Sequence, residues 1–448
     1  MKLVIDGAAV STVDAAGTEH ATGHVIVVDG RIQAVGGGAA PKGLDAHYVD
    51  GRECLLTPGF VNTHHHLYQW ATRGYAQQAI LFEWLTELYP VWGRLDADIV
   101  HAAASAGLTR LAQTGCTTAA DHHYVFPSNG GDVFAALVSA GERVGIRLHA
   151  IRGSMDRGVS HGGLPPDNIV ETIDGALAGT ADAIGKYHDP AFDSMIRVAV
   201  GPCSPFSVSE ELMRRGAELA RSMNVRMHTH LAETVEEEQQ CLAEFGCTPL
   251  EYAERLGWLG GDSWFAHGIH FSDSAVEKLA STRTGVTHCP SSNSRLGAGI
   301  ARTADLLGAG APVGLGVDGA ASHEDGGLLQ ELRQAMYLAR QRGGPAALSA
   351  REALRIATIG GARVLGREKE IGSIEPGKLA DLALWRLDGF EHAGIADPVA
   401  ALVLGPVPPL ALLTVGGRPV VTDGQLTGVD EEQLAAELRV ASRRLAER

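Results

Sequence analysis

The chain has 448 residues, of which 45% are apolar, 5% aromatic and 20% charged. This composition is typical of a globular protein with a substantial core, and it excludes the disordered and fibrous classes. The formal net charge is −16, and no basic cluster in the sequence relieves it. We therefore expect a small-molecule partner and no nucleic acid.

The cysteines and the apolar stretches indicate a compartment. Six cysteines form no CxxC pair and lie mostly in apolar segments, which is typical of a reducing cytosol. The N-terminus reaches Asp6 before an apolar stretch typical of a signal peptide develops. The longest apolar stretch, 398–415, is interrupted by prolines, which would break a spanning helix. We expect a cytoplasmic protein without a membrane segment.

Both ends of the chain predict β-strands. Near the N-terminus, β-branched runs alternate with turns at 3–7, 24–30 and 31–35, and Asp-Gly between such runs is a strong hairpin signal. The same style returns at 380–385 and 412–421. The two ends therefore predict one small β-domain, followed by a charged, periodic tail that predicts a closing amphipathic helix.

Between these ends, short apolar strands alternate with helical stretches, which is typical of a parallel α/β architecture. Eight strands are expected, at 55–61, 117–121, 147–152, 197–201, 225–230, 264–267, 285–288 and 313–317. Eight such units fit a (β/α)8 TIM barrel, whose chemistry gathers at the carboxyl ends of the strands. We expect the barrel over 57–367 and the β-domain over 1–56 together with 368–448.

Histidines stand at several of these strand ends. The first strand ends in His64-His65-His66, and alternation along an extended chain points His64 and His66 the same way and His65 the other. His230 and Asp318 end two further strands. Three imidazoles and one carboxylate suit Zn²⁺ or Fe²⁺, with a position left for water.

Other histidines offer alternatives to this ligand set. A lone histidine is more often structural than a ligand, and four are assigned to the structural class: His101, His149, His161 and His188. His228 shares a face with His230 and is its rival. His230 is preferred because it lies at the end of the strand, and because Glu233 could then reach over the same water.

The motifs together resemble the amidohydrolase superfamily, in particular its cytosine/guanine/S-adenosylhomocysteine deaminase branch. The segments that carry the resemblance are PGFVNTHHH (58–66), HLAE (230–233), AH (266–267), HCPSSN (288–293), GVDGAAS (316–322) and GSIEPGKLADL (372–382). They span nearly the whole chain. The resemblance implies a metal-dependent barrel flanked by a β-sandwich built from both termini.

The resemblance also implies catalytic roles for a deaminase. Asp318 would be both a metal ligand and the base that takes the water proton, and Glu233 would deliver a proton to a ring nitrogen. His267 would hydrogen-bond the attacking oxygen. Superfamily members with two metals generally carry a carbamylated lysine at the end of strand four, and here that strand, VAVGPC (198–203), has none. We expect one divalent metal, with zinc as first choice and iron as the alternative.

The substrate is suggested by short local matches. Gln69 follows His66 by three residues, as in guanine deaminases, where a glutamine reads the purine edge. Cys203 stands where those enzymes have an arginine, which argues against guanine itself. The segments 64–69, 88–92, 120–127 and 201–207 look most like those of 8-oxoguanine deaminases. The resemblance implies conversion of 8-oxoguanine to urate and ammonia, with isoxanthopterin, guanine and hydroxytriazines as alternatives.

Further residues are candidates for contacts with the substrate. Four aromatic residues after strand one could stack on a flat heterocycle, although two could equally anchor the segment to the barrel: Trp70, Trp84, Tyr89 and Trp92. Trp92 is assigned to the substrate. Arg152 could donate to a substrate carbonyl or form a structural ion pair, and Cys203 could contact the substrate or simply pack. His122 and His123 are expected to support the metal shell or line the pocket.

Two other function classes are alternatives to a deaminase. A metal-free scaffold protein on the same fold would be expected to have lost ligands, and none is lost here. Removal of an alkylamine or a halide from a triazine would use nearly the same site and stays open. By analogy with relatives, a homodimer or homotetramer is expected.

Overall fold

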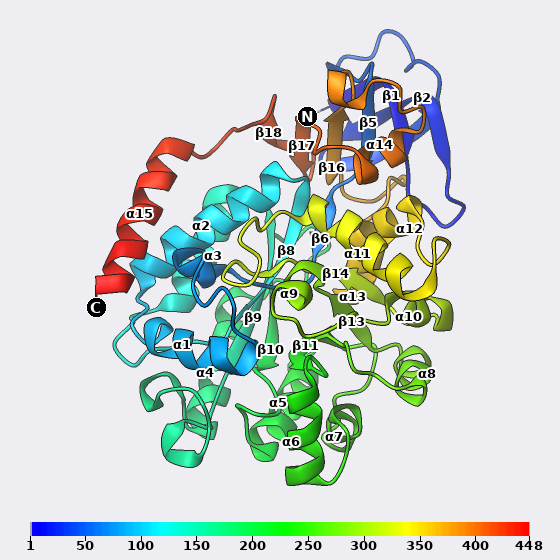
Figure 1. The fold of residues 1–448 in the computed structure, drawn as a ribbon. Helices are drawn as coiled ribbons and strands as arrows, with labels where there is room; N and C mark the ends of the chain where they lie inside the picture. Colours follow the sequence, from blue (N-terminus) through cyan, green and yellow to red (C-terminus); the bar gives the residue numbers. More distant parts are fainter. Residues whose placement is uncertain (1, 448) are drawn as a thin grey trace.

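A closed barrel of parallel strands forms the centre of the computed structural model, which describes residues 2–447 (Figure 1). Around the barrel the strands are β10 (Ile196–Pro202), β11 (Met227–Leu231), β12 (Ser263–His267), β13 (Gly285–His288), β14 (Val313–Leu315), β6 (Phe60–Asn62), β8 (Cys116–His123) and β9 (Arg147–Ser154). The predicted (β/α)8 barrel is confirmed.

Helices cover the outside of the barrel. The longer ones are α1 (Leu81–Trp92), α2 (Ala97–Gln113), α3 (Val133–Val144), α4 (Ile173–Tyr187), α5 (Glu210–Ser222), α6 (Val235–Phe245), α8 (Asp273–Thr282) and α11 (Leu328–Gly343). Shorter ones are α7 (Pro249–Arg255), α9 (Pro290–Arg295), α10 (Thr303–Ala309), α12 (Ala350–Arg355), α13 (Gly361–Val364) and the 3-10 helix η1 (Leu67–Thr72). Helix α14 (Pro398–Leu404) lies beside the outer sheet, where it packs on α11 and α12 (Figure 1). Side chains at the N-terminal ends of the helices cap them. The Asp96 carboxylate accepts from the Ile99 backbone N–H at the start of α2, and the Ser209 hydroxyl accepts from that of Leu212 at the start of α5.

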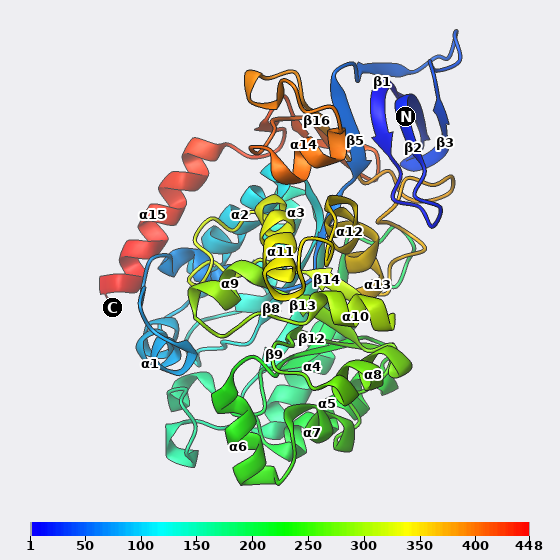
Figure 2. The same cartoon turned by 45° about the vertical axis from the view of Figure 1, so that its right-hand side comes forward.

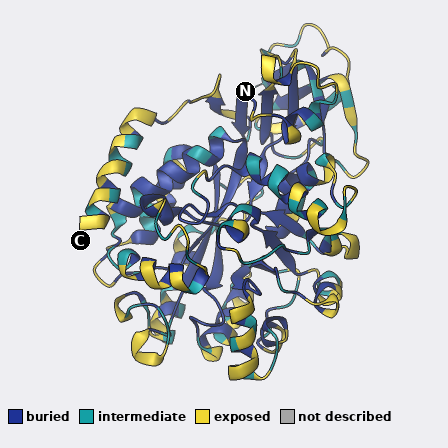
Figure 3. Ribbon diagram, in the orientation of Figure 1, coloured by how far each residue is buried: buried dark blue, intermediate teal, exposed yellow. Residues whose placement is uncertain are grey.

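Burial follows this layering. The barrel strands are buried except for the first two residues of β10, whereas the outer faces of the helices are exposed (Figure 3). A sequence that alternates short buried strands with half-buried helices satisfies both patterns in this arrangement. Among residues 2–447 no helix is both long enough and apolar enough to cross a lipid bilayer.

The first expected strand, 55–61, is two strands in the structure. Its first part, β5 (Cys54–Pro58), belongs to the outer sheet, and its second part, β6, belongs to the barrel. The break falls at Gly59, where a Cβ atom would lie 2.2 Å from Cγ2 of Thr117. Only glycine fits this crossing, so the N-terminal β-segment extends to Pro58 and the barrel begins at Phe60.

The two chain ends build a second unit beside the barrel (Figures 1 and 2). Its strands are β1 (Lys2–Ser11), β2 (Glu19–Val28), β3 (Arg31–Gly37), β4 (His47–Asp50), β5, β16 (Leu382–Arg386), β17 (Leu410–Val415), β18 (Arg418–Thr422) and β19 (Gln425–Leu426). They hydrogen-bond as one nine-stranded sheet, because β5 pairs with both β1 and β16. The extra domain built from both termini is confirmed, and its strands form one continuous sheet.

The final helix, α15 (Glu431–Glu447), lies along the barrel and not on the sheet (Figure 1, red). Arg444 pairs with Asp96 at 2.7 Å, and Glu437 pairs with Arg143 at 2.6 Å. The sequence prediction grouped this helix with the second β-segment. Its contacts are with the barrel because its few buried apolar side chains, Leu434 among them, form one face that packs there.

Candidate active site

The histidines and carboxylates singled out in the sequence meet at the carboxyl end of the barrel. Two short strands hold the first group: β7 (His65–His66) pairs in parallel with β15 (Asp318–Gly319). Asp318 adopts a left-handed backbone conformation with φ of 60°, and its N–H donates to the His64 carbonyl at 3.2 Å. The pairing therefore seats Asp318 beside the two imidazoles of the His-x-His motif.

Backbone carbonyls fix the tautomers of two imidazoles. Nδ1 of His66 lies 2.7 Å from the His122 carbonyl oxygen, and Nδ1 of His230 lies 2.6 Å from that of Cys203. Because a carbonyl can only accept, each Nδ1 carries the proton and each Nε2 keeps a lone pair. The two Nε2 atoms lie 3.0 Å apart, facing one another.

A third imidazole is oriented through a second histidine. Nδ1 of His228 lies 2.9 Å from the Trp264 carbonyl oxygen and donates to it. The neutral His228 ring therefore accepts at Nε2, which lies 2.8 Å from Nδ1 of His64. Burial holds the pKa of His228 well below its usual value, which keeps that ring neutral. The lone pair on Nε2 of His64 is left to face the centre of the site.

The carboxylate of Asp318 completes this group. Its Oδ1 lies 3.3 Å from Nε2 of His64 and 3.4 Å from Nε2 of His66. Burial lowers the pKa of both imidazoles, and lowers that of His230 to about 3, so all three are neutral at pH 7. Buried lone pairs that face each other repel, and a cation between them relieves that repulsion.

The donor set fits a divalent metal ion. Nitrogen and carboxylate oxygen are ligands that zinc and iron accept. Two overlapping groups of ligand atoms lie within 4.8 Å of one another: His64, His122 and His230 form one, and His64, His267 and Asp318 form the other. Nε2 of His122 donates to the Gly201 carbonyl at 2.7 Å, and its Nδ1 has no hydrogen-bond partner among the described residues. The His122 ring lies beside the proposed ligands, and its own carbonyl orients His66 as described above.

Two further titratable groups face the same centre. Burial raises the pKa of Glu233 to about 7, and its Oε2 lies 3.6 Å from Nε2 of His267. Nδ1 of His267 lies 2.9 Å from Oδ1 of Asn293. Burial lowers the pKa of His267, but the carboxylates of Glu233 and Asp318 outweigh it and raise that pKa above its usual value.

Two serines hold the other oxygen of Asp318. The Ser292 hydroxyl donates to Oδ2 at 2.5 Å, and the Ser322 hydroxyl lies 3.4 Å from the same atom. Burial by itself raises the pKa of Asp318, but its imidazole neighbours hold that pKa well below the usual value, and His267 is the one among them whose own pKa is raised. Asp318 is therefore a carboxylate with one oxygen bound by hydroxyls and the other facing the imidazoles.

A narrow cavity of about 30 Å³ lies over these groups. Its wall is formed by Gln69, Trp84, Tyr89, Tyr124, Cys203, Phe206 and Leu296, with leucines of α1. Cys203 and Gln69, which the sequence assigned to the substrate, lie at this wall. A cavity of this volume is smaller than a bicyclic ring, so side chains of the wall have to move before such a ring can enter.

Trp92 and Arg152 do not line this cavity. Trp92 is fully buried behind it, where its Nε1 donates to the Thr72 hydroxyl at 3.2 Å. Arg152 forms a two-pronged ion pair with Glu171 at 2.6 and 2.7 Å. In this structure the two side chains make packing and ion-pairing contacts, and their assignment to the substrate stays a prediction. Trp84 and Tyr89 are the members of the aromatic group that reach the cavity.

Gln69 is the side chain of the wall whose amide has both a donor and an acceptor group without a partner in the described part of the chain. It is fully buried, and within residues 2–447 neither its Oε1 nor its Nε2 has a hydrogen-bond partner. It lies against Gly319, where a Cβ atom would come 1.8 Å from Oε1. A glycine at 319 therefore leaves room for the amide, and the amide keeps one donor and one acceptor group for a molecule in the cavity.

Sequence reasoning did not single out several of these residues. Ser292 and Asn293 lie in the HCPSSN segment and Phe206 in GPCSPFS, so the motifs were visible although the contacts were not. The sequence also indicated that His228 lies near the site, because His228 and His230 share one face of a strand. The hydrogen bond between His228 and His64 was visible only in the structure. Tyr124 directly follows the His122-His123 pair at the end of β8.

Known proteins resemble this chain over nearly its full length. The sequence profile of the Amidohydrolase family matches residues 55–422. The chain is 45% identical to an 8-oxoguanine deaminase of Pseudomonas aeruginosa over 94% of each chain. It is 35% identical to an isoxanthopterin deaminase of an unknown prokaryotic organism, over 94% of this chain and 91% of that protein.

A solved structure has the same fold. The zinc complex of an atrazine chlorohydrolase from Arthrobacter aurescens superimposes with a TM-score of 0.93 at 32% identity, covering 98% of this chain and 100% of that one. The fold and the cluster of imidazoles at its carboxyl end define a metal-dependent hydrolase. The chain belongs to the Amidohydrolase family.

Proposed function

We propose that this protein is a zinc-dependent deaminase that hydrolyses 8-oxoguanine to urate and ammonia. The observation that carries the proposal is the shared cavity, in which the free amide of Gln69 and the carboxyl group of Glu233 face the same centre as three imidazole lone pairs. The 45% identity to an 8-oxoguanine deaminase supports the choice of substrate.

His64, His66, His230 and Asp318 are the proposed metal ligands. Zinc is preferred over iron because the similar hydrolase from Arthrobacter aurescens is a zinc complex. A divalent metal bound there lowers the pKa of a water molecule from about 15.7 to near 7, which supplies hydroxide at neutral pH.

Asp318 is the proposed base. Its pKa lies well below the usual value, so it is ionised at pH 7 and can take a proton from water. The Ser292 hydroxyl fixes Oδ2 and thereby turns Oδ1 toward the imidazoles. Because the carboxylate is already oriented, little conformational entropy is lost when the proton is transferred.

Glu233 and His267 are the proposed partners of the substrate. Because burial raises its pKa to about 7, Glu233 can hold a proton at neutral pH and pass it to the ring nitrogen beside the aminated carbon. Protonation of that nitrogen makes the carbon electrophilic. After the oxygen adds, the proton taken by Asp318 passes to the amino group, the C–N bond breaks, and ammonia leaves. His267, whose Nδ1 is engaged by Asn293, presents Nε2 to the oxygen that adds to the carbon.

Specificity is assigned to the amide of Gln69. A purine with a carbonyl next to a ring N–H offers an acceptor and a donor side by side, which matches the two groups of a primary amide. Trp84 and Phe206 supply apolar wall for the ring faces, and Cys203 leaves room where a longer side chain would fill the cavity.

Ammonia release across a substrate panel tests the function. We expect 8-oxoguanine to have the highest kcat/KM among 8-oxoguanine, isoxanthopterin, guanine and hydroxytriazines. Gln69→Leu should lower that value about tenfold or more through the lost hydrogen bonds, whereas Gln77→Leu, at an exposed glutamine, should not. Brisk turnover of another member with none of 8-oxoguanine would overturn the substrate and leave the metal site standing.

The cytoplasmic location, the domain bounds and a homodimer or homotetramer remain predictions. Within the described chain all six cysteines are free, and five of them are buried, which agrees with a reducing compartment. Sedimentation of the purified protein measures the oligomeric state directly.

A further inference from the structure

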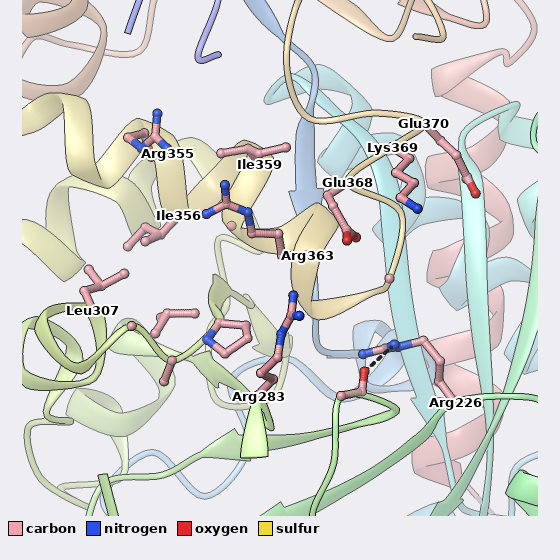
Figure 4. A pocket seen from close by; sticks show the side chains of 17 residues that line it. Arg226, Arg283, Leu307, Arg355, Ile356, Ile359, Arg363, Glu368, Lys369 and Glu370 are labelled. Atoms are coloured by element: carbon pink, nitrogen blue, oxygen red, sulfur yellow. Dashed lines mark hydrogen bonds between the residues drawn. The ribbon is translucent and has the colours of Figure 1, made fainter. Parts of the chain in front are cut away.

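A second, larger cavity, drawn in Figure 4, opens at the amino-terminal end of the barrel. Its volume is about 740 Å³. One wall comes from the residues just before β11, β12, β13 and β14, and the other from the helical segment 355–363 and the loop 366–370. The catalytic residues follow the opposite ends of the same strands, so the two cavities are separate.

The lining of this cavity is rich in positive charge. Five cationic side chains line it: Arg226, Arg283, Arg355, Arg363 and Lys369. The carboxylates are Glu368 and Glu370, and Glu370 is already paired with Arg197 at 2.7 Å and with Arg367 at 2.6 Å. Positive charge therefore exceeds the negative charge available to balance it, in a chain whose net charge is −16.

Arg226 is a fixed part of the wall. Its guanidinium donates to the Gly261 carbonyl at 2.8 Å and to the Val364 carbonyl at 2.6 Å. Its Nε is buried and has no hydrogen-bond partner among the described residues. Burial lowers the pKa of Arg226 to about 10, so it is still charged at neutral pH. Two carbonyls hold this cation in place, and neither cancels its charge.

Three further cations are available to a ligand. Arg283, Arg363 and Lys369 make no ion pair and no side-chain hydrogen bond to any residue between 2 and 447. In Figure 4 the side chains of Arg283 and Arg363 reach into the middle of the cavity from opposite walls. Groups that converge from two walls can contact one anion at the same time.

The opposite part of the cavity carries three apolar side chains. Leu307, Ile356 and Ile359 lie on the side away from Arg226 and Lys369, with Arg355 beside them (Figure 4). Both isoleucines belong to η4 (Ile356–Gly360), a π-helical turn between α12 and α13. Such turns are frequent at functional sites, and this one presents its side chains to the cavity.

We propose that this cavity binds a nucleoside polyphosphate, with the phosphates against Arg226, Arg283, Arg363 and Lys369 and the base against Leu307, Ile356 and Ile359. The volume lies within the range of pockets that enclose such molecules. Planar guanidinium groups match phosphate oxygens in pairs, and the apolar wall matches the face of a base. The cations come from separate segments, so the sequence shows no basic cluster.

Calorimetric titration of the metal-loaded protein at low salt tests the proposal. The probes are ATP, GTP, inorganic tripolyphosphate and adenosine. We expect the nucleotides to bind more tightly than tripolyphosphate, and adenosine to bind weakest. Arg283→Gln and Arg363→Gln should each weaken nucleotide binding about tenfold, as expected for one charge-assisted hydrogen bond. Arg439→Gln, at an exposed arginine of α15, is the matched control and should bind normally.

Each alternative outcome has a defined meaning. Failure of both nucleotides to bind, or equal binding by wild type and the two cavity variants, overturns the proposal. Tripolyphosphate binding as tightly as the nucleotides overturns the role of the apolar wall. Melting temperature and metal content establish that the variants are folded, and Lys369→Gln provides a second test if either arginine variant is unstable. Binding is measured without a deaminase substrate, so it stands or falls independently of the proposed reaction.

Discussion

Nε2 of His228 lies 2.8 Å from Nδ1 of His64, and the far side of the His228 ring is tied to the Trp264 carbonyl at 2.9 Å. This chain of two contacts decides the tautomer of His64. It also gives the two histidines of β11 different roles. His230 directs its Nε2 to the centre of the site, whereas His228 contacts the proposed ligand His64.

His228→Phe should therefore weaken metal retention. The substitution keeps a ring in the core but removes the acceptor for His64, and loss of such a supporting contact typically costs about 10- to 100-fold in metal affinity. Competition with a zinc chelator measures the change. His149→Phe is the matched control. His149 is also a buried histidine whose ring contacts Trp264, but it makes no hydrogen bond to His64. Equal zinc affinity in both variants would contradict the role of His228.

Ser292→Ala should lower kcat and leave the metal content unchanged. The Ser292 hydroxyl donates to Oδ2 of Asp318, and a hydrogen bond to a charged group contributes about 1.5–3 kcal/mol, which corresponds to about a tenfold or greater loss of rate. Ser294→Ala on the same helix is the control, because that hydroxyl donates to the Pro290 carbonyl. A normal kcat for Ser292→Ala would show that Asp318 is oriented by other contacts.

Glu233→Gln should bind metal normally and lose most turnover. The variant keeps the size of the side chain but has no acidic proton to give, and general acid–base help contributes about 10²- to 10⁴-fold. Initial rates and metal content are measured on the same sample. Glu236→Gln, on the exposed side of α6, should retain full activity. An active Glu233→Gln enzyme with normal metal would refute the assignment of the proton donor.

Removing the metal should lower both activity and melting temperature. Without a cation, Nε2 of His66 and Nε2 of His230 face each other at 3.0 Å. A ligand that binds only the folded state at 1,000 times its Kd stabilises that state by about 4 kcal/mol. Dialysis against a chelator followed by addition of zinc or iron tests this in a melting scan. A His66→Ala variant should show no metal-dependent shift, and a wild-type protein that melts identically with and without metal would count against the site.

Asp121 should make stability depend on pH. Burial raises its pKa to about 8 from a usual 3.8, while its Oδ1 accepts from the Leu67 N–H at 2.6 Å. Between pH 3.8 and about 8 the folded state keeps a proton that the unfolded state releases. Stability therefore falls across that window as pH rises, by up to about 1.4 kcal/mol per pH unit, and levels off above it.

Asp121→Asn removes this dependence because the amide resembles the neutral acid. The melting temperature of the variant relative to wild type should rise between pH 5 and pH 8 and then stay constant. Asp98→Asn, at an exposed site on α2, should follow wild type at every pH. Parallel curves for Asp121→Asn and wild type would show that Asp121 is ionised in the folded protein.

Much of the candidate site follows from local sequence. The alternation of an extended chain places His64 and His66 on one side wherever the strand lies, and strand–helix alternation predicts a barrel that gathers strand ends. The pattern could not separate β5 from β6, because both parts are equally apolar and only the approach of Thr117 to Gly59 divides them.

Contacts between distant segments were decided by the tertiary structure. The sequence suggests Arg152 and Trp92 as substrate contacts. In the structure Arg152 pairs with Glu171 at 2.6 Å, and Trp92, at the end of α1, donates to the Thr72 hydroxyl. The basic cavity likewise exists only because four strand ends bring Arg226 and Arg283 near Arg363. The sequence by itself determined the composition, the strand periodicity and the ligand types, since these depend on neighbours along the chain. Partners across the barrel depend on how the elements pack, which no local period encodes.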